Sequence, residues 1–457
     1  MKRNYISIVS LLFSTLLLWQ CEPKVDSFTP SAGSADFSKF IAIGDSYTAG
    51  YTDGALSKYG QMNSYSAILA NQLTTVGSMG FTQPFLPDGK SIGSAGNSSY
   101  YLVPTGVPSS PVMPTTDTGN LELLTDPSTW INGNYQNVGV PGAKSFHLLV
   151  PEYGNPTLGQ GNFNPFYARF ASNPGTSTML TDAMANDPTF FCLWLAGNDV
   201  LTYALSGGQG NNGGTENNDI TDASTFTYAI NSILATLTSG GAKGVMANIP
   251  DIEAIPHISY IQYNALVLTE EQATQMNVAY ANYNAAAEAY SLPKMNFKAG
   301  NNAFVISDPD FPIAQIRQAK EGEKILLGAL SGIQGEEKWG SANPIPVNYR
   351  LTLQAVQNIQ FAINTFNSIL EDLASKYDVA FVDVNSLMED LKDGLVIDGN
   401  KYTNTFVTGG IFSLDGIHAT GRGSAIIANS FIEAINAQFD AQVPEVNIND
   451  YKTVEFP

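Results

Sequence analysis

The chain has 457 residues, of which 41 are aspartate or glutamate and only 21 are lysine or arginine, for a net charge of −20 at pH 7. So few basic side chains exclude an extended basic surface, and binding to nucleic acid or to an anionic membrane surface is therefore not expected. Hydrophobic residues make up 44% of the chain and charged residues only 14%. This composition is typical of a globular protein with many uncharged polar loops, and the length suffices for one large or two ordinary domains.

The first residues of the chain have the pattern of an export signal. Lys2 and Arg3 precede an apolar stretch over residues 6–18, which is too short to span a bilayer comfortably. The stretch leads into LLLWQC, which ends in Cys21. This segment resembles a bacterial lipoprotein signal, in which the cysteine is lipidated after cleavage, although a tryptophan and a glutamine stand where small residues are usual. An ordinary secretory signal or a single anchor helix is the alternative.

We therefore expect residues 1–20 to be a signal peptide and residues 21–38 to be a linker that begins with a lipidated Cys21. Such a protein would be anchored in the bacterial cell envelope, with the outer membrane as the expected location. The second cysteine, Cys192, lies in the apolar run FFCLWLAG and has no partner once Cys21 is lipidated. We expect it to be an inert, buried thiol.

Continuous apolar runs alternate with amphipathic segments along the rest of the chain. Such runs suit a parallel sheet that is covered on both faces. Strands are predicted at residues 40–43, 135–140, 190–195, 244–249 and 379–384, and helices at residues 64–73, 225–237, 270–290, 351–377 and 423–439. The alternation predicts an α/β fold with right-handed crossovers. We expect one domain over residues 39–440, with loop insertions at about 74–134, 151–188 and 250–350, followed by a C-terminal tail over residues 441–457.

Polar residues follow the predicted strands, and the carboxyl ends of parallel strands are where sites form. Directly after the first four runs stand Gly44-Asp45-Ser46, NVGVPGAKS with Gly139 and Gly142, Gly197-Asn198-Asp199, and Pro250-Asp251. SLDGIHATGRG, with Asp415 and His418, stands between the fifth run and the last helix. Hydrolysis of an ester needs a nucleophile, a base, a group that orients the base, and donors for the oxyanion. Ser46 can be the nucleophile, His418 the base and Asp415 the orienting group. The Ser46 amide, the Gly142 amide and the Asn198 side chain can be the donors.

Four of these motifs, GDS, the glycine of VPGAK, GND and DGIH, match in order the four blocks of the SGNH (GDSL-type) hydrolases, which this sequence resembles. NIPDIEAIPH is loosely similar to a proline-containing block of the plant-type members. The resemblance implies a flavodoxin-like three-layer sandwich with a five-stranded parallel sheet of order 2-1-3-4-5. It also implies a triad of Ser46, Asp415 and His418, with Ser46, Gly142 and Asn198 forming the oxyanion hole. Tyr47 replaces the common leucine, and we expect little consequence because that position is not catalytic.

The expected function is that of a carboxylic ester hydrolase, an esterase or lipase that works through an acyl-enzyme on Ser46 without a cofactor or a metal. An acyl lipid or an acetylated glycan would be the substrate, so a carbohydrate O-acetyl esterase is one alternative. A non-catalytic surface lipoprotein that binds glycan or a membrane partner is another. Loop aromatics could wall an acyl pocket, although for most of them packing of the loops is the preferred interpretation: Phe81, Phe85, Phe163, Phe166, Tyr167 and Phe170.

Other motifs are weaker. Residues 89–93 fit G-x-S-x-G and residues 208–213 fit G-x-G-x-x-G, but neither has the flanking strand and helix that its motif requires, so we expect loops. Residues 216–222 are acidic and could hold calcium, although they lack the spacing of a known loop. His147 is expected on a helix face and His257 near the cleft. Two scattered histidines do not predict a metal site.

Overall fold

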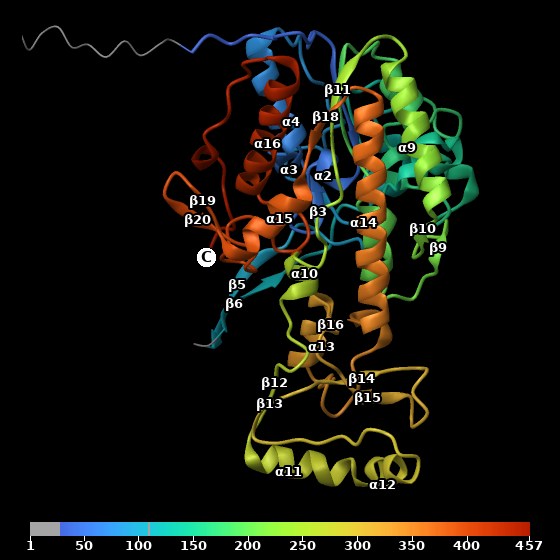
Figure 1. Ribbon diagram of the computed structural model, residues 1–457, viewed down its shortest axis with the longest axis vertical. Coiled ribbons are helices and arrows are strands. Elements are labelled where there is room, and N and C mark those ends of the chain that lie inside the picture. The colour runs from blue at the N-terminus through green and yellow to red at the C-terminus, as the bar shows by residue number, and fades with distance from the viewer. Residues whose placement is uncertain (1–27, 108–109) are drawn as a thin grey trace, which may run out of the picture.

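A computed structural model describes residues 28–107 and 110–457 (Figure 1). At its centre is a five-stranded sheet in the spatial order β7-β1-β8-β11-β18, and all neighbouring strands in it are parallel. The strands are β1 (Phe40–Gly44), β7 (Asn137–Gly139), β8 (Phe190–Trp194), β11 (Lys243–Ala247) and β18 (Ala380–Val382). Each overlaps one of the predicted apolar runs. Numbered by their order along the chain, the five strands run 2-1-3-4-5 across the sheet.

Helices cover the sheet on two sides. Figure 1 shows α4 (Tyr65–Leu73) and α16 (Gly421–Phe439) on one side, and α9 (Ala223–Thr238) and α14 (Leu353–Lys376) on the other. Every residue of β1 and β8 is buried between these layers, which explains why the strands are apolar runs rather than alternating patterns. All four helices begin after a serine, threonine or aspartate whose side chain accepts a backbone hydrogen bond, so their starts are encoded locally.

The helix predicted over residues 270–290 is two helices, α11 (Glu270–Ala279) and α12 (Ala281–Ala289). Tyr280 separates them with φ −91° and ψ 11°. Its hydroxyl donates to the Ser341 carbonyl at 2.9 Å and its ring packs against Phe297. These contacts come from residues distant in sequence, so the local helical pattern could not reveal the break.

The remaining elements are short. The helices are α2 (Ser46–Ala49), α3 (Lys58–Met62), α5 (Glu122–Thr125), α6 (Pro165–Ala168), α7 (Met179–Met184), α8 (Asn198–Leu205), α10 (Pro256–Ser259), α13 (Leu330–Gln334) and α15 (Val384–Asp393). A three-stranded sheet contains β2 (Tyr51–Thr52), β3 (Ala55–Ser57) and β4 (Ser91–Ile92). Two-stranded sheets pair β5 (Tyr101–Val107) with β6 (Ser110–Thr115), β9 (Asn212–Gly214) with β10 (Ile220–Thr221), β12 (Leu266–Leu268) with β13 (Gly300–Asn302), β14 (Val305–Ser307) with β15 (Ile316–Gln318), β16 (Lys324–Ile325) with β17 (Arg350–Leu351), and β19 (Leu395–Ile397) with β20 (Asn400–Tyr402).

The segment from about residue 261 to residue 349 has small apolar clusters of its own, separate from the main core. In Figure 1 its helices α11 and α12 lie at the end of the molecule farthest from the central sheet. Arg317 is buried there and forms ion pairs with Asp308 and Glu323. Residues of this segment in and just before α13, together with His257 of the preceding α10, contribute to the cleft described below.

Both ends of the predicted domain extend further than expected. The signal peptide and Cys21 lie outside the described residues, but the later part of the predicted linker packs against the domain. Phe37 is 1% exposed and its ring lies 4.6 Å from that of Phe190. In the predicted tail, Val443 and Ile448 are buried as well. The folded unit therefore includes residues assigned by sequence to the linker and the tail, because isolated apolar side chains in polar segments fill the edge of the core.

Cys192 lies in β8 and is fully buried, as predicted. Burial raises the pKa of its thiol far above the ordinary value. Among the helices of residues 28–107 and 110–457, none has the length and apolar character needed to cross a membrane.

Candidate active site

Ser46 lies where β1 ends and α2 begins, at the carboxyl edge of the sheet. Asp45 caps this short helix by accepting a hydrogen bond from the Tyr47 amide at 3.0 Å. Ser46 is the first residue of the helix, so its amide has no earlier helical carbonyl to which it could donate. Ser46 is 9% exposed. The GDS turn thus presents a nearly buried hydroxyl beside an unpaired backbone donor.

His418 and Asp415 come from a loop between β20 and α16, more than 360 residues away along the chain, and they meet Ser46 directly. His418 Nε2 lies 2.8 Å from Ser46 Oγ, and His418 Nδ1 lies 2.7 Å from Asp415 Oδ2. A carboxylate can only accept, so the neutral imidazole donates from Nδ1 and its Nε2 is free to accept from the serine hydroxyl. The structure therefore brings together the three residues that the sequence assigned to a triad.

The carboxylate of Asp415 is held by several donors. Its Oδ1 accepts from the Ile417 and His418 amides, both at 2.8 Å, and from the Ser413 hydroxyl at 3.1 Å. Burial alone would raise the pKa of Asp415. The charge of His418 and these hydrogen bonds outweigh that effect and hold the pKa well below its usual range. Asp415 is thus ionised and oriented before any substrate binds.

Ser46, Gly142 and Asn198, the three potential sources of oxyanion donors, line the same cavity. Asn198 begins α8 directly after β8, and its Nδ2 donates to the Ala143 carbonyl at 3.0 Å. This contact places Asn198 next to the Pro141–Gly142 turn, where Gly142 has φ +82°. Neither the Gly142 amide nor the Ser46 amide donates to an acceptor in the described part of the chain. Unpaired amides beside a nucleophile are the arrangement that stabilises a tetrahedral oxyanion.

Two further carboxyl groups lie beneath these donors. Asp45 is buried, and its Oδ2 lies 3.5 Å from Asn198 Nδ2. Burial raises the pKa of Asp45 to about 7, although the Tyr47 amide and the charge of His418 oppose this shift. Asp199 is fully buried and accepts from the Ser145 amide and hydroxyl at 2.8 and 2.7 Å. These two hydrogen bonds join Asp199 of the GND motif to Ser145, which follows VPGAK directly. The two motifs therefore hold each other in position.

Sequence reasoning missed the turn that supports the loop carrying Asp415 and His418. Asp53 and Gly54 join β2 to β3 and have φ of +51° and +72°. The Asp53 amide donates to Ser413 Oγ at 3.0 Å, and its carboxylate accepts from the Leu414 amide at 2.9 Å. The Gly54 amide reaches Asp415 Oδ2 at 2.8 Å. An Asp-Gly dipeptide is a strong hairpin signal, but its partner lies too far away in sequence to be inferred.

Tyr47 and Tyr51 form the walls around His418. Their rings lie 5.3 and 4.8 Å from the imidazole, and the Tyr47 hydroxyl donates to the Ile417 carbonyl at 2.5 Å. The sequence led us to expect little consequence from tyrosine at position 47. The structure shows that this side chain touches both His418 and the loop that carries it.

The remaining histidines have separate surroundings. His257 lines the same cavity as Ser46, as expected, and its Nδ1 lies 3.1 Å from the Asp415 carbonyl oxygen. His147 belongs to a 3-10 helix, Ser145–Leu149, where its ring stacks on Tyr153 at 4.0 Å. Burial and the neighbouring Lys144 lower the pKa of His147 to about 3, so it is neutral at physiological pH.

The acidic loop over residues 216–222, which was considered for calcium, binds the ammonium group of Lys144. The ammonium group of Lys144 is buried and donates to the carbonyls of Glu216 and Asp219 at 2.9 and 2.8 Å. The Asp219 carboxylate accepts from the Asn211 and Glu216 amides. The loop therefore closes over Lys144, which follows the Gly142 turn by two residues.

The G-x-S-x-G stretch is not a loop throughout, because Ser91 belongs to strand β4, which pairs with β3. The next element after it is strand β5 rather than a helix, so residues 89–93 do not form a nucleophile elbow. In the G-x-G-x-x-G stretch, Asn212 and Gly213 belong to the short strand β9.

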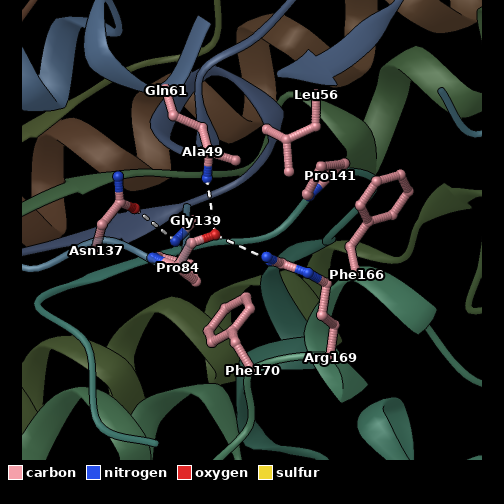
Figure 2. A pocket seen from close by; sticks show the side chains of 10 residues that line it. All are labelled: Ala49, Leu56, Gln61, Pro84, Asn137, Gly139, Pro141, Phe166, Arg169 and Phe170. Carbon is pink, nitrogen blue, oxygen red and sulfur yellow. Dashed lines mark hydrogen bonds between the residues drawn. The ribbon is translucent and has the colours of Figure 1, made fainter. Parts of the chain in front are cut away.

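The six loop aromatics do not line the cavity that contains Ser46. Phe166, Tyr167 and Phe170 are instead buried in the main hydrophobic core. Figure 2 shows part of that core, in which the Pro84 carbonyl accepts from Gln61 Nε2 and from the guanidinium of Arg169, both at 2.9 Å. Arg169 is 2% exposed and also donates to the Phe85 carbonyl. Packing of the loops, the preferred interpretation for these aromatics, thus holds for the three buried rings.

A search of protein-family models finds none that matches this chain, and a search of curated proteins finds no match either.

Proposed function

We propose that the protein is a serine hydrolase that cleaves carboxylic esters through an acyl-enzyme on Ser46. The observation that carries this proposal is the unbroken line of hydrogen bonds from Ser46 through His418 to Asp415, at 2.8 and 2.7 Å. A buried serine, a histidine in the accepting tautomer and an ionised aspartate are the parts that activate a hydroxyl for acyl transfer.

The chemistry follows from this geometry. His418 takes the proton of Ser46 as Oγ attacks the ester carbonyl carbon, and Asp415 stabilises the imidazolium that forms. The amides of Ser46 and Gly142 and the side chain of Asn198 receive the oxyanion. His418 then gives its proton to the departing alkoxide, and a water molecule, activated by His418, releases the acid. The scheme uses no cofactor or metal.

The fold supports the same proposal. The strand order 2-1-3-4-5 is that of a flavodoxin-like sheet, and Ser46, Gly142 and Asn198 follow β1, β7 and β8 at its carboxyl edge. We take the fold to be a flavodoxin-like sandwich, decorated by insertions at about residues 74–134, 151–188 and 250–350. We infer from the four ordered motifs, which support this hypothesis, that the protein is an SGNH (GDSL-type) hydrolase.

The lipid anchor at Cys21, and with it a location in the bacterial cell envelope, belongs to the proposal as well. Its support is the N-terminal pattern of the sequence. The other cysteine is buried in the central sheet, which leaves Cys21 as the residue for such an anchor.

The experiment is hydrolysis of p-nitrophenyl butyrate by the purified protein and by Ser46→Ala, with Ser239→Ala, a serine on the exposed end of α9, as the matched control. We expect the wild type and the control to be equally active and Ser46→Ala to lose at least about a thousandfold in turnover. An inactive wild type, or an active Ser46→Ala, would contradict the proposal, and an inactive wild type would favour the non-catalytic binding protein.

A further inference from the structure

Ser46 and His418 open into a cavity of about 570 Å³. This volume is in the range of sites that enclose a whole small molecule, and an acetyl group would occupy only a small part of it. The size of the cavity therefore points to a larger acyl group.

One wall of this cavity consists of leucines. Leu201 and Leu205 come from α8, whose first residue is Asn198, and Leu327 and Leu330 come from the 3-10 helix Leu327–Ala329 and from α13. All four are only partly buried, whereas the leucines of β8, α4 and α9 are covered. Covering open apolar surface beside a nucleophile with an alkyl chain is favourable, because that surface is removed from water.

A second, more polar groove of about 900 Å³ meets the cavity at Ser94, Pro141, Gly142 and Thr202. Its lining combines aromatic rings with amide side chains, among them Trp130, Tyr153, Phe163, Asn162, Asn217 and Asn218. Aromatic faces and amides suit the apolar faces and hydroxyl groups of a polyol. Because the two spaces share Gly142, a proposed oxyanion donor, an ester bound at Ser46 can extend into both.

The charges around these spaces select against anionic head groups. Among the described residues, no lysine or arginine lines either space. His147 lines the groove but is neutral because its pKa is lowered to about 3 by burial and by Lys144. Glu216 lines the groove as well. A phosphate would lose its hydration here without meeting a cation.

We propose that the substrates are medium- or long-chain acyl esters of uncharged polyols, such as acylglycerols or acylated sugars. The acyl chain occupies the leucine-walled cavity and the polyol occupies the groove. The inference rests on the proposed function of Ser46. The ester C–O bond breaks, the acyl group forms a new ester with Ser46 Oγ, and the polyol leaves with the proton from His418. Water then releases the fatty acid.

The first experiment compares kcat/KM for p-nitrophenyl decanoate and p-nitrophenyl acetate. We expect the wild type to prefer decanoate at least tenfold, and Leu330→Trp, which fills the cavity, to lower the decanoate-to-acetate ratio at least tenfold. Leu158→Trp replaces a leucine that is 43% exposed and lines neither space, and it should leave the ratio unchanged.

Partial misfolding of a variant does not change the decanoate-to-acetate ratio, because it lowers the amount of active enzyme equally for both esters. A wild type that prefers acetate, or a ratio unchanged in Leu330→Trp, would overturn the acyl-chain assignment while leaving the proposed function intact. Hydrolysis of neither ester would instead contradict the proposed function on which the inference rests.

The second experiment tests the head group with two lipids that carry the same chain, 1-decanoylglycerol and 1-decanoyl-glycero-3-phosphoglycerol. We expect kcat/KM to be at least tenfold higher for the uncharged lipid. Equal rates, or faster hydrolysis of the phosphate-containing lipid, would overturn the assignment of an uncharged polyol.

Discussion

The amide of Gly54 donates a hydrogen bond to Asp415 Oδ2 at 2.8 Å, although the two residues are 361 positions apart in the chain. The same oxygen lies 2.7 Å from His418 Nδ1. The turn that follows the nucleophile helix thus holds the carboxylate that orients the imidazole. The two ends of the domain are coupled at the point where the proposed chemistry takes place.

This coupling predicts the effect of Asp415→Asn. The amide group has the size of the carboxylate, but its NH2 would face the donors of Gly54 and His418, so the imidazole would lose its accepting tautomer. We expect kcat on p-nitrophenyl butyrate to fall about 10³- to 10⁴-fold, with KM nearly unchanged. Asp187→Asn, at a carboxylate whose side chain is 86% exposed, is the control. A loss smaller than tenfold in Asp415→Asn would refute the orienting role.

Asn198 is predicted to act on the transition state. Removing its amide in Asn198→Ala should lower kcat by about a hundredfold or more, because one donor to the oxyanion is lost. KM should change little, because binding of the uncharged ester carbonyl of the substrate depends less on this donor than the oxyanion does. Steady-state kinetics measure both constants, and near-normal turnover would mean that Asn198 only supports the Ala143 carbonyl to which it donates.

Tyr47→Phe removes the hydroxyl that donates to the Ile417 carbonyl while it keeps the ring beside His418. We expect the free energy of unfolding to fall by about 1–2 kcal/mol, because the carbonyl loses a largely buried partner. Tyr228→Phe, at a tyrosine that is 69% exposed, should have no measurable effect. Chemical denaturation of the two variants checks this, and equal stabilities would show that the Tyr47 hydroxyl is dispensable.

Asp45 is predicted to make stability depend on pH. Its pKa is raised to about 7 in the folded protein from the ordinary 3.8 by burial, so between these values the folded state binds a proton that the unfolded state has released. Folding stability contributed by this group is therefore present below about pH 4 and is lost as the pH rises to about 7.

Comparison with Asp45→Asn, which carries no titrating group, isolates this effect. The difference in free energy of unfolding between wild type and variant should change by a few kcal/mol between pH 4 and pH 8, to the disadvantage of the wild type. Each unit by which the pKa is raised contributes about 1.4 kcal/mol to this change. Denaturant unfolding at both pH values measures the difference. A difference that does not vary with pH would show that Asp45 titrates normally.

The strands could be predicted from sequence because their signals are local, and the meeting of Ser46, His418 and Asp415 because four motifs resemble, in order, those of a known family. An apolar run such as residues 40–43 marks a buried strand, and the GDS, VPGAK and GND motifs follow such runs. What could not be predicted depends on packing between distant segments. The contact of Gly54 with Asp415 and the leucine wall from residues 327–330 require knowledge of which loops meet. The burial of Phe37 could not be predicted either, because it is a single apolar residue in a polar segment. The folded unit therefore begins earlier than the sequence predicted.

The central claim, that Ser46 is an activated nucleophile, is tested most directly by a fluorophosphonate probe followed by mass spectrometry of the labelled peptide. We predict that the folded wild type takes up one probe on Ser46. Heat-denatured protein and Ser46→Ala should take up none, and Asp415→Asn should react much more slowly. Folded wild-type protein that stays unlabelled, or that is labelled at another residue, would contradict the account.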